Sequence, residues 1–158
     1  MSDIYPQVYR ASVAGMILNN SKQILMVQNT SFKENEWDFP KGGMIEDEEE
    51  IDTLKREIRE ELGNDLKYSI IKQSSINIIY SWSKDKQRKE GMRGQARISF
   101  WLSYLSGVIE LDPNEIRQYK WVELEELEDL LKKSRWPSEV VQNLMFDLDR
   151  VNKIRDNA

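Results

Sequence analysis

Apolar residues in the first thirty positions are grouped as in β-strands and are not spaced as in a helix. Residues 8–18 (VYRASVAGMIL) are rich in β-forming and small residues, and residues 23–28 (QILMVQ) follow the polar turn 19–22 (NNSK). Two such runs joined by a short polar turn predict a β-hairpin. In the next stretch, TSFKENEWDFPKGG at 30–43, Pro40 and Gly42-Gly43 predict that no regular element continues.

The clearest helical pattern runs from about Glu48 to Leu62. Four apolar residues in this stretch recur at spacings of three and four, which places them on one face of a helix: Ile51, Leu54, Ile58 and Leu62. Gly63 directly after them supplies a stop signal. The pattern therefore predicts an amphipathic helix with one buried stripe.

The second half of the chain alternates between strand-like and helix-like segments. Strands are predicted at Tyr68–Trp82, Gln95–Leu105 and Tyr119–Val122, a polar loop at 83–94 (SKDKQRKEGMRG), and helices at Glu123–Lys133 and from about Pro137 to Val151. Some neighbouring strands are joined by turns too short for parallel crossovers. This favours an α/β fold with a mixed sheet and helices packed on it over a doubly wound parallel sheet.

Composition narrows the possible chemistry. The 158 residues suit one domain spanning 1–158, and their net charge of −5 argues against a dedicated duplex-DNA binder. The chain contains neither His nor Cys, which excludes catalytic triads, thiolate nucleophiles, zinc fingers and disulfides. Carboxylates that act together with cations preferring oxygen ligands remain as candidate catalytic groups. Without a signal-peptide pattern or a long apolar run, we expect a cytoplasmic protein with no membrane partner.

Three carboxylates share one face of the predicted helix. Glu57, Glu60 and Glu61 lie within about 100° of arc, next to the apolar stripe. Carboxylates that converge repel one another, and Mg²⁺ or Mn²⁺ relieves that repulsion. Arg56 lies four residues before Glu60 and can therefore hold one carboxylate in place. Gly42 lets the backbone bend so that a carbonyl can also bind the cation. The competing interpretation is a solvated charged face, which is the usual role of such runs.

The segment 42–64 resembles the signature of the Nudix hydrolases, G-x5-E-x7-R-E-U-x-E-E-x-G-U, where U is aliphatic. Eight positions match at the required spacing: Gly42, Glu48, Arg56, Glu57, Ile58, Glu60, Glu61 and Gly63. The last position departs, because Asn64 replaces an aliphatic residue. The resemblance implies an α/β/α sandwich with a central mixed sheet and Mg²⁺- or Mn²⁺-dependent hydrolysis of a diphosphate linked to another moiety.

The same resemblance implies roles for individual residues. Glu57, Glu60 and Glu61, with the Gly42 carbonyl, would hold the metal, and the structural residues would be Glu48, Arg56 and Gly63. Three further segments resemble the RNA pyrophosphohydrolases and dinucleoside polyphosphate hydrolases, namely WDFPKGG at 37–43, the GQ that opens the strand at 94–95, and EIRQYKWV at 115–122. By that resemblance, Arg10 would contact phosphate. Glu115 would be a further metal ligand or the general base, and its alternative is an exposed loop acid. The catalytic residues would be Glu57, Glu60, Glu61 and Glu115, with Glu57 or Glu115 activating the water.

Substrate contacts are expected from Lys41, Arg93, Gln95 and Tyr119. The basic loop 83–94, with a local charge of +3, is a candidate grip for polyphosphate or an RNA backbone or else merely a soluble loop. Tyr80, Trp82 or Tyr119 would stack a base unless they belong to the core. The leading substrate is an RNA 5′ end or a dinucleoside polyphosphate. A (d)NTP pyrophosphatase and a non-catalytic nucleotide sensor are the alternatives. The sequence leaves open the biological substrate, the preferred cation, the general base and the oligomeric state.

Overall fold

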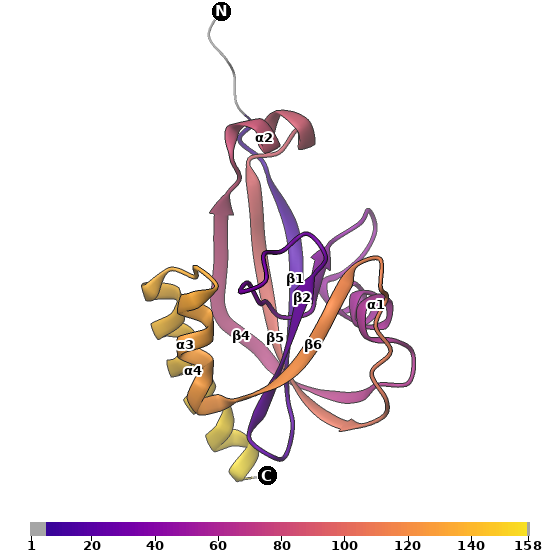
Figure 1. Cartoon of the computed structure of the whole chain (residues 1–158), viewed down its shortest axis with the longest axis vertical. Coiled ribbons are helices and arrows are strands. Elements are labelled where there is room, and N and C mark those ends of the chain that lie inside the picture. Colours follow the sequence, from indigo (N-terminus) through magenta and orange to yellow (C-terminus); the bar gives the residue numbers. More distant parts are fainter. Residues whose placement is uncertain (1–5, 158) are drawn as a thin grey trace, which may run out of the picture.

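A mixed β-sheet with helices on both faces forms the body of the molecule (Figure 1). The computed structural model describes residues 6–157. Its elements are, in chain order, β1 (Tyr9–Leu18), β2 (Gln23–Asn29), β3 (Lys41–Gly43), α1 (Glu50–Leu62), β4 (Lys67–Ser81), α2 (Lys84–Glu90), β5 (Gly94–Ser106), β6 (Ile116–Glu123), α3 (Leu124–Lys133) and α4 (Ser138–Asp156).

The sheet has the strand order β4-β5-β1-β2-β6, and the short strand β3 pairs with β1. β1 and β5 are parallel from the pair Tyr9–Gly94 to the pair Leu18–Ser103, whereas the other strand pairs are antiparallel. The predicted hairpin is present as β1 and β2, and the predicted mixed sheet is confirmed. β1 therefore lies at the centre, paired with β5 on one side and with β2 and β3 on the other.

Alternate residues of β1 supply two separate cores. Val13 and Ile17 pack on the face covered by α1, together with that helix's buried Leu54 and Ile58. Residues of the opposite parity, such as Met16, pack on the face covered by α3 and α4. Figure 1 shows α1 on one side of the sheet and α3 and α4 on the other. This is the α/β/α sandwich that the sequence predicted, and it follows from the period of two along a strand.

Two segments differ from the sequence expectations. The stretch expected to be a polar loop contains α2, whose first turn is capped by the Ser83 hydroxyl accepting from the Lys86 backbone N–H at 3.3 Å. The side chain of Gln87 is buried and donates to the Trp82 carbonyl at 2.8 Å, which fixes the helix to the end of β4. These contacts of polar side chains do not appear in a hydrophobic pattern. The second difference is β3, a short strand where no regular element was expected.

Asp147 on α4 is a buried acid that holds the layers together. Its side chain is 1% exposed and accepts hydrogen bonds from the Ser74 hydroxyl at 2.7 Å, the Ser75 hydroxyl at 3.1 Å and the Trp101 indole N–H at 2.7 Å. Since these donors come from β4 and β5, the carboxylate connects α4 to two strands of the sheet. Among residues 6–157, no helix is both long and apolar enough to cross a membrane.

Candidate active site

β3 passes between α1 and β1 at two glycines, and each glycine makes room for a charged side chain. A Cβ atom on Gly42 would lie 1.8 Å from the carboxyl carbon of Glu57, and a Cβ on Gly43 would lie 2.2 Å from the guanidinium of Arg10. Only glycine permits such close approach. The fold therefore brings Glu57 and Arg10, from elements far apart in the sequence, to the segment Lys41–Gly43, which we call the β3 turn.

Glu61 is the most buried of the three helix glutamates, with 4% of its surface exposed. One oxygen, Oε1, accepts from the Lys41 backbone N–H at 3.4 Å, and the other, Oε2, has no hydrogen-bond partner among residues 6–157. Burial raises the pKa of Glu61 to about 8, against the lowering effect of the nearby Lys41 charge. A buried carboxylate with an unpartnered oxygen is costly unless a proton or a cation accompanies it.

Glu57 and Glu115 lie close enough to Glu61 to interact with it electrostatically. The pKa of Glu57 is raised mainly by burial, which outweighs its hydrogen bond with Arg56, and the charge of Glu115 raises it further. Glu115 also raises the pKa of Glu61. Glu115 is exposed and comes directly before β6, where its carbonyl accepts from the Thr30 N–H at 3.0 Å. A segment more than fifty positions beyond the helix thus contributes an acid to the site.

Arg56 connects four groups around the site. Its Nε donates to Glu48 at 2.6 Å, its Nη1 to Glu57 at 2.8 Å and to Glu60 at 3.3 Å, and its Nη2 to the Gly43 carbonyl at 2.9 Å. The hydrogen bond from Arg56 is the main cause that lowers the pKa of Glu48 to about 2. Within the described part of the chain, no three acidic side chains form a complete metal-binding group. In this structure Glu57 and Glu60 are both hydrogen-bonded to Nη1 of Arg56.

The donor set fits a hard divalent cation. The groups near the turn are carboxylate oxygens of Glu57, Glu60 and Glu61, with the backbone of Gly42 beside them, and oxygen ligands are those that Mg²⁺ and Mn²⁺ prefer. The unpartnered Oε2 of Glu61 is the direct structural sign, since a cation next to it would remove the cost of its burial.

Two of the four expected substrate contacts lie near the turn. The Lys41 ammonium lies 5.5 Å from the centre of the Phe32 ring, and its charge acts on Glu61. Gln95 is the β5 partner of Arg10 and accepts from the Tyr80 hydroxyl at 2.6 Å.

The other two lie farther along the sheet. Arg93 donates to the side chain of Gln7 at 3.2 Å, just before β5 begins. Tyr119 is 40% exposed on β6, which β2 separates from β1. The structure therefore gathers Arg10, Lys41 and Gln95 but not Arg93 or Tyr119.

Gly63 ends α1 with a positive φ of 93°, a conformation that favours glycine. A Cβ atom there would lie 2.9 Å from the Cβ of Glu110. This glycine therefore shapes the connection after the carboxylate helix.

The sequence did not predict the buried ion pair between Asp38 and Arg97. Both oxygens of Asp38 accept from Arg97, at 2.9 and 3.0 Å, and both residues are buried. Burial alone would raise the pKa of Asp38, but the charges of Arg97 and Lys41 hold it below its ordinary value. The pair anchors the turn before β3 to β5. The available signal was an acid within the apolar run 37–40 and an arginine within the strand-like run 95–105, because a buried charge requires a partner.

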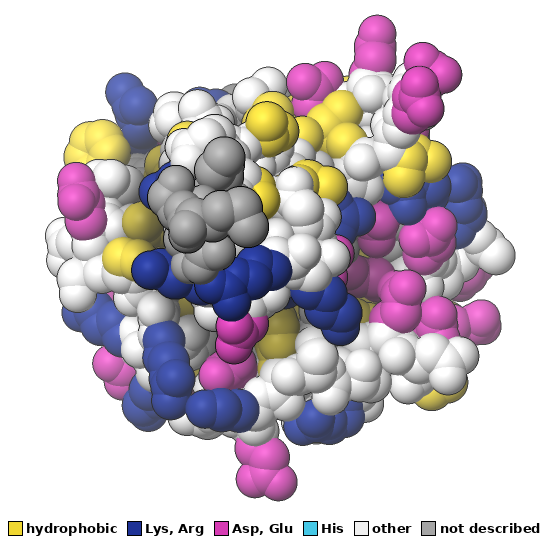
Figure 2. Space-filling view, turned by 90° about the horizontal axis from the view of Figure 1, so that it is seen from above, with side chains coloured by type: hydrophobic (Ala, Val, Ile, Leu, Met, Phe, Trp, Pro, Cys, Tyr) yellow, Lys and Arg dark blue, Asp and Glu magenta, His cyan; other side chains and the backbone are white. Residues whose placement is uncertain are grey.

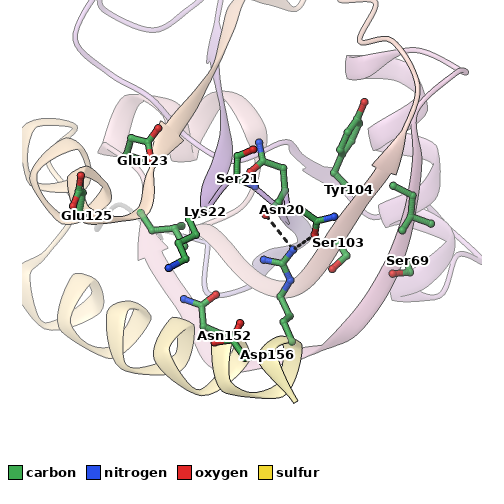
Figure 3. Close-up of a pocket in the computed structure, with 14 residues that line it drawn as sticks. Asn20, Ser21, Lys22, Ser69, Ser103, Tyr104, Glu123, Glu125, Asn152 and Asp156 are labelled. Atoms are coloured by element: carbon green, nitrogen blue, oxygen red, sulfur yellow. Dashed lines mark hydrogen bonds between the residues drawn. The ribbon is translucent and has the colours of Figure 1, made fainter. Parts of the chain in front are cut away.

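A separate cavity lies where the β1–β2 hairpin turns (Figure 3), at the opposite end of the sheet from α2 (Figure 1). Its volume is about 830 Å³, and its lining includes Lys22, Tyr104, Glu123, Glu125 and Arg155. Arg155 donates to the Asn19 carbonyl and to the Asn20 side chain, which ties the end of α4 to the hairpin turn. None of the signature glutamates lines this cavity, so it is not part of the carboxylate site.

Comparison with known proteins identifies the family. Residues 8–144 match the family model described as the NUDIX domain. The chain belongs to the Nudix family. An RNA pyrophosphohydrolase of Zymomonas mobilis is 31% identical over 131 residues, covering 78% of this chain and 84% of that protein. The mRNA-decapping enzyme subunit 2 of Saccharomyces cerevisiae is 28% identical over 138 residues, covering 85% of this chain but 13% of the yeast protein.

Solved structures support the fold of this Nudix protein. A Caenorhabditis elegans Ap4A hydrolase superposes with a TM-score of 0.63 at 18% identity, over 89% of this chain and 98% of that one. The Escherichia coli dihydroneopterin triphosphate pyrophosphohydrolase gives 0.64 at 19% identity, over 89% and 99%. Together with the family match, these findings show a Nudix hydrolase, an enzyme of the pyrophosphohydrolase type. Hydrolases of this family generally use divalent metals.

Proposed function

We propose that this Nudix hydrolase cleaves a phosphoanhydride bond at the 5′ end of RNA or in a dinucleoside polyphosphate, with Mg²⁺ or Mn²⁺. The observation that carries the proposal is the buried Glu61 carboxylate with an unpartnered oxygen beside the Gly42 turn. The similarity to an RNA pyrophosphohydrolase over 78% of the chain favours the RNA 5′ end. The similarity to a decapping enzyme subunit supports the same class of substrate.

The metal would be held by Glu57, Glu60 and Glu61 together with the Gly42 carbonyl. When bound, a divalent cation neutralises charge on the diphosphate and lowers the pKa of a water molecule. Arg56 keeps two of the carboxylates oriented through its Nη1, and its other nitrogens hold Glu48 and the Gly43 carbonyl. These hydrogen bonds limit the motion of Glu57 and Glu60, whose oxygens a bound cation would share with Arg56.

Glu115 is our candidate for the general base, with service as an additional metal ligand as its alternative role. It is exposed, so a water molecule can reach it, and its charge already acts on Glu57 and Glu61. Arg10 and Lys41 would bind the phosphates, because both lie beside the β3 turn on which the carboxylates converge. Gln95, the strand partner of Arg10, would support the same end of the substrate.

A panel of substrates tests the proposal. We would incubate the purified protein with Mg²⁺ or Mn²⁺ and 5′-triphosphate RNA, capped RNA, diadenosine tetraphosphate, a nucleotide sugar or free nucleoside triphosphates, and then identify the products. We expect kcat/KM for RNA 5′ ends or the dinucleotide to exceed that for free nucleoside triphosphates by at least about tenfold, which corresponds to about 1.4 kcal/mol of transition-state discrimination.

Other outcomes would assign a different function. Hydrolysis of free nucleoside triphosphates to monophosphate and pyrophosphate, with RNA and dinucleotide untouched, would establish a (d)NTP pyrophosphatase instead. Tight nucleotide binding without turnover of any substrate would indicate a sensor. The complete set of signature carboxylates argues against the sensor, because every acidic position of the signature, and eight of its nine specified positions in all, retain the residues expected of an active enzyme.

A further inference from the structure

We infer that α2 and Arg93 form a binding surface for the RNA chain that follows the 5′ end. This surface, which we call the α2 surface, consists of α2 (Lys84–Glu90) and Arg93. The inference rests on the proposed RNA substrate and extends it, because it predicts a preference for long RNA over short phosphoanhydrides. The partner is single-stranded RNA, recognised through its phosphate backbone.

α2 lies at the end of the sheet where β1 begins (Figure 1), and Arg10 is the second residue of β1. The parallel pairing of β1 with β5 places Gly94 opposite Tyr9 and Gln95 opposite Arg10. The Arg93 backbone N–H donates to the Val8 carbonyl at 2.8 Å. Since Gly43 pairs with Ser12, the distance along β1 from the β3 turn to this hydrogen bond is about 13 Å at about 3.3 Å per residue.

The charge of the α2 surface contrasts with the rest of the chain. Residues 84–93 carry five basic and two acidic side chains, a local charge of +3 in a protein of net charge −5. Figure 2 looks onto this end of the molecule and shows Lys and Arg side chains spread over its centre and lower left, with many Asp and Glu side chains on the right. A local positive region beside an acidic site attracts a polyanion and steers it toward the site.

The α2 surface is a folded element and not a loose basic loop. Ser83 caps α2, and Gln87 joins it to the Trp82 carbonyl. The Lys86 ammonium lies 4.5 Å from the centre of the Trp82 ring, and Arg93 is held by Gln7. Charges held in fixed positions lose less conformational entropy on binding than charges on a mobile loop. The α2 surface is therefore a preformed basic surface that extends toward Arg10 in a protein of negative net charge.

Substrate length separates this inference from a merely soluble helix. A dinucleoside polyphosphate has no phosphate backbone beyond its polyphosphate bridge, whereas an RNA chain of several nucleotides bound by its 5′ end would carry further phosphates toward the α2 surface. Contacts to the RNA backbone are sensitive to salt, and each lysine that contacts a phosphate adds about one to the slope of log affinity against log salt concentration. Loss of such contacts raises KM for long RNA and leaves the chemical step unchanged.

The experiment compares two charge-reversed variants of the full-length protein. Lys86→Glu/Lys89→Glu changes the α2 surface. Lys67→Glu/Lys153→Glu makes the same change in net charge at exposed positions away from it, at the start of β4 and late in α4. We would measure binding of 5′-monophosphate RNA of about 20 nucleotides by fluorescence anisotropy, a length that exceeds one typical single-strand site. Hydrolysis of 5′-triphosphate RNA and of diadenosine tetraphosphate would be measured alongside.

We expect Lys86→Glu/Lys89→Glu to weaken RNA binding by about tenfold or more at low salt and to reduce the salt slope by about two. KM for long RNA should rise while kcat and the dinucleotide reaction stay within about twofold. Lys67→Glu/Lys153→Glu should behave like the unchanged protein. Melting temperatures would verify that each variant is folded, and Lys86→Gln/Lys89→Gln would replace the reversed variant if it unfolds.

Equal RNA binding by the two variants would overturn the role of the α2 surface while leaving the proposed function intact. A matching loss in both variants would also overturn it, because net charge and not position would then explain binding. Failure of the proposed function has a different signature, namely no hydrolysis of any RNA 5′ end or dinucleotide by the unchanged protein. The binding measurement distinguishes the two failures because it does not depend on turnover.

Discussion

Asp147 and Glu61 are both almost completely buried carboxylates, at 1% and 4% exposure, but their surroundings differ. Asp147 accepts from two serine hydroxyls and an indole N–H. Glu61 accepts one backbone N–H at 3.4 Å and keeps an unpartnered oxygen. Burial favours the protonated form of both, yet the donors hold the pKa of Asp147 below its ordinary value, whereas the pKa of Glu61 rises to about 8.

The difference separates an acid that holds the fold together from one that is prepared for a ligand. Hydrogen bonds from fixed donors satisfy Asp147 and connect α4 to the sheet, so removing its charge damages the fold. An ionised Glu61 without a bound cation destabilises the folded protein, so keeping this residue lowers the stability of the metal-free fold. A buried carboxylate whose donors are incomplete is therefore a better sign of a metal site than burial alone.

Replacing Glu61 by Gln should have the largest effect. Glu61→Gln removes a proposed metal ligand and its charge, and we expect kcat/KM to fall by about a thousandfold, or about 4 kcal/mol of transition-state stabilisation. The fold should persist, because Gln has nearly the same shape as the protonated Glu61 that the metal-free fold retains. Turnover with Mg²⁺ or Mn²⁺ and the melting temperature would be measured together. Activity near that of the unchanged protein would exclude Glu61 from the metal site.

Asp147→Asn is the matched acid-to-amide change in the other region. The amide presents an NH₂ group to donors that require an acceptor, and we expect a loss of about 3 kcal/mol in the free energy of unfolding. Denaturant titration would measure that loss, and kcat of the folded fraction should stay within about twofold. A variant with full stability and lost turnover would reverse the roles that we assign to the two acids.

Much of the fold could be predicted from the sequence, because the core obeys simple periodicities. The stripe of Leu54, Ile58 and Leu62 predicted α1, and all three side chains are buried there. The alternation along β1 divides cleanly between the two cores. α2 was missed because it is held by a capping hydroxyl and a buried amide, Ser83 and Gln87, which do not contribute to a hydrophobic pattern.

The site was predicted in part, for a related reason. Fixed spacing placed Glu57, Glu60 and Glu61 on one face of a helix and Arg56 four residues before Glu60, but it did not predict the hydrogen bonds of Arg56 to Glu48 and Glu57. Sequence spacing does not reveal which carboxylate becomes buried. That depends on the depth to which Glu61 packs beneath the Lys41 backbone. The sequence offered a buried acid and a buried arginine, but it did not indicate that Asp38 and Arg97 pair with each other, because they are 59 positions apart.

The stability of the metal-free protein should also depend on pH, with an effect smaller than that of either substitution. The folded pKa of Glu61 lies above the unfolded value, so folded Glu61 retains a proton that the unfolded chain releases. Stability should therefore fall as pH rises from about 6 to about 8, by on the order of 2 kcal/mol. The raised pKa of Glu57 contributes in the same direction.

Denaturant titrations with a chelator would measure this pH dependence. Glu61→Gln should reduce the slope, and Mg²⁺ should abolish most of it in the unchanged protein. Asp147 has the opposite sign, because its folded pKa is lowered: its contribution is present above the unfolded pKa and is lost as pH falls below that value through the folded pKa. Stability that rises from pH 6 to 8 without metal would contradict the buried, proton-retaining state of Glu61.

Replacing the exposed Glu128 should have the smallest effect on stability, and this change serves as the control for both buried acids. It pairs with Lys132 at 3.1 Å on α3, and both side chains are more than 40% exposed, at 41% and 45%. An exposed pair of this spacing contributes about 0.3–0.5 kcal/mol, because water screens the charges and both side chains lose rotamer freedom. Glu128→Gln should therefore shift the free energy of unfolding by less than about 0.5 kcal/mol at low salt and leave kcat/KM unchanged. Denaturant titration at low and high salt would measure it. A loss comparable with that of Asp147→Asn would mean that carboxylate removal itself, and not the completeness of the surrounding donors, governs stability in this protein.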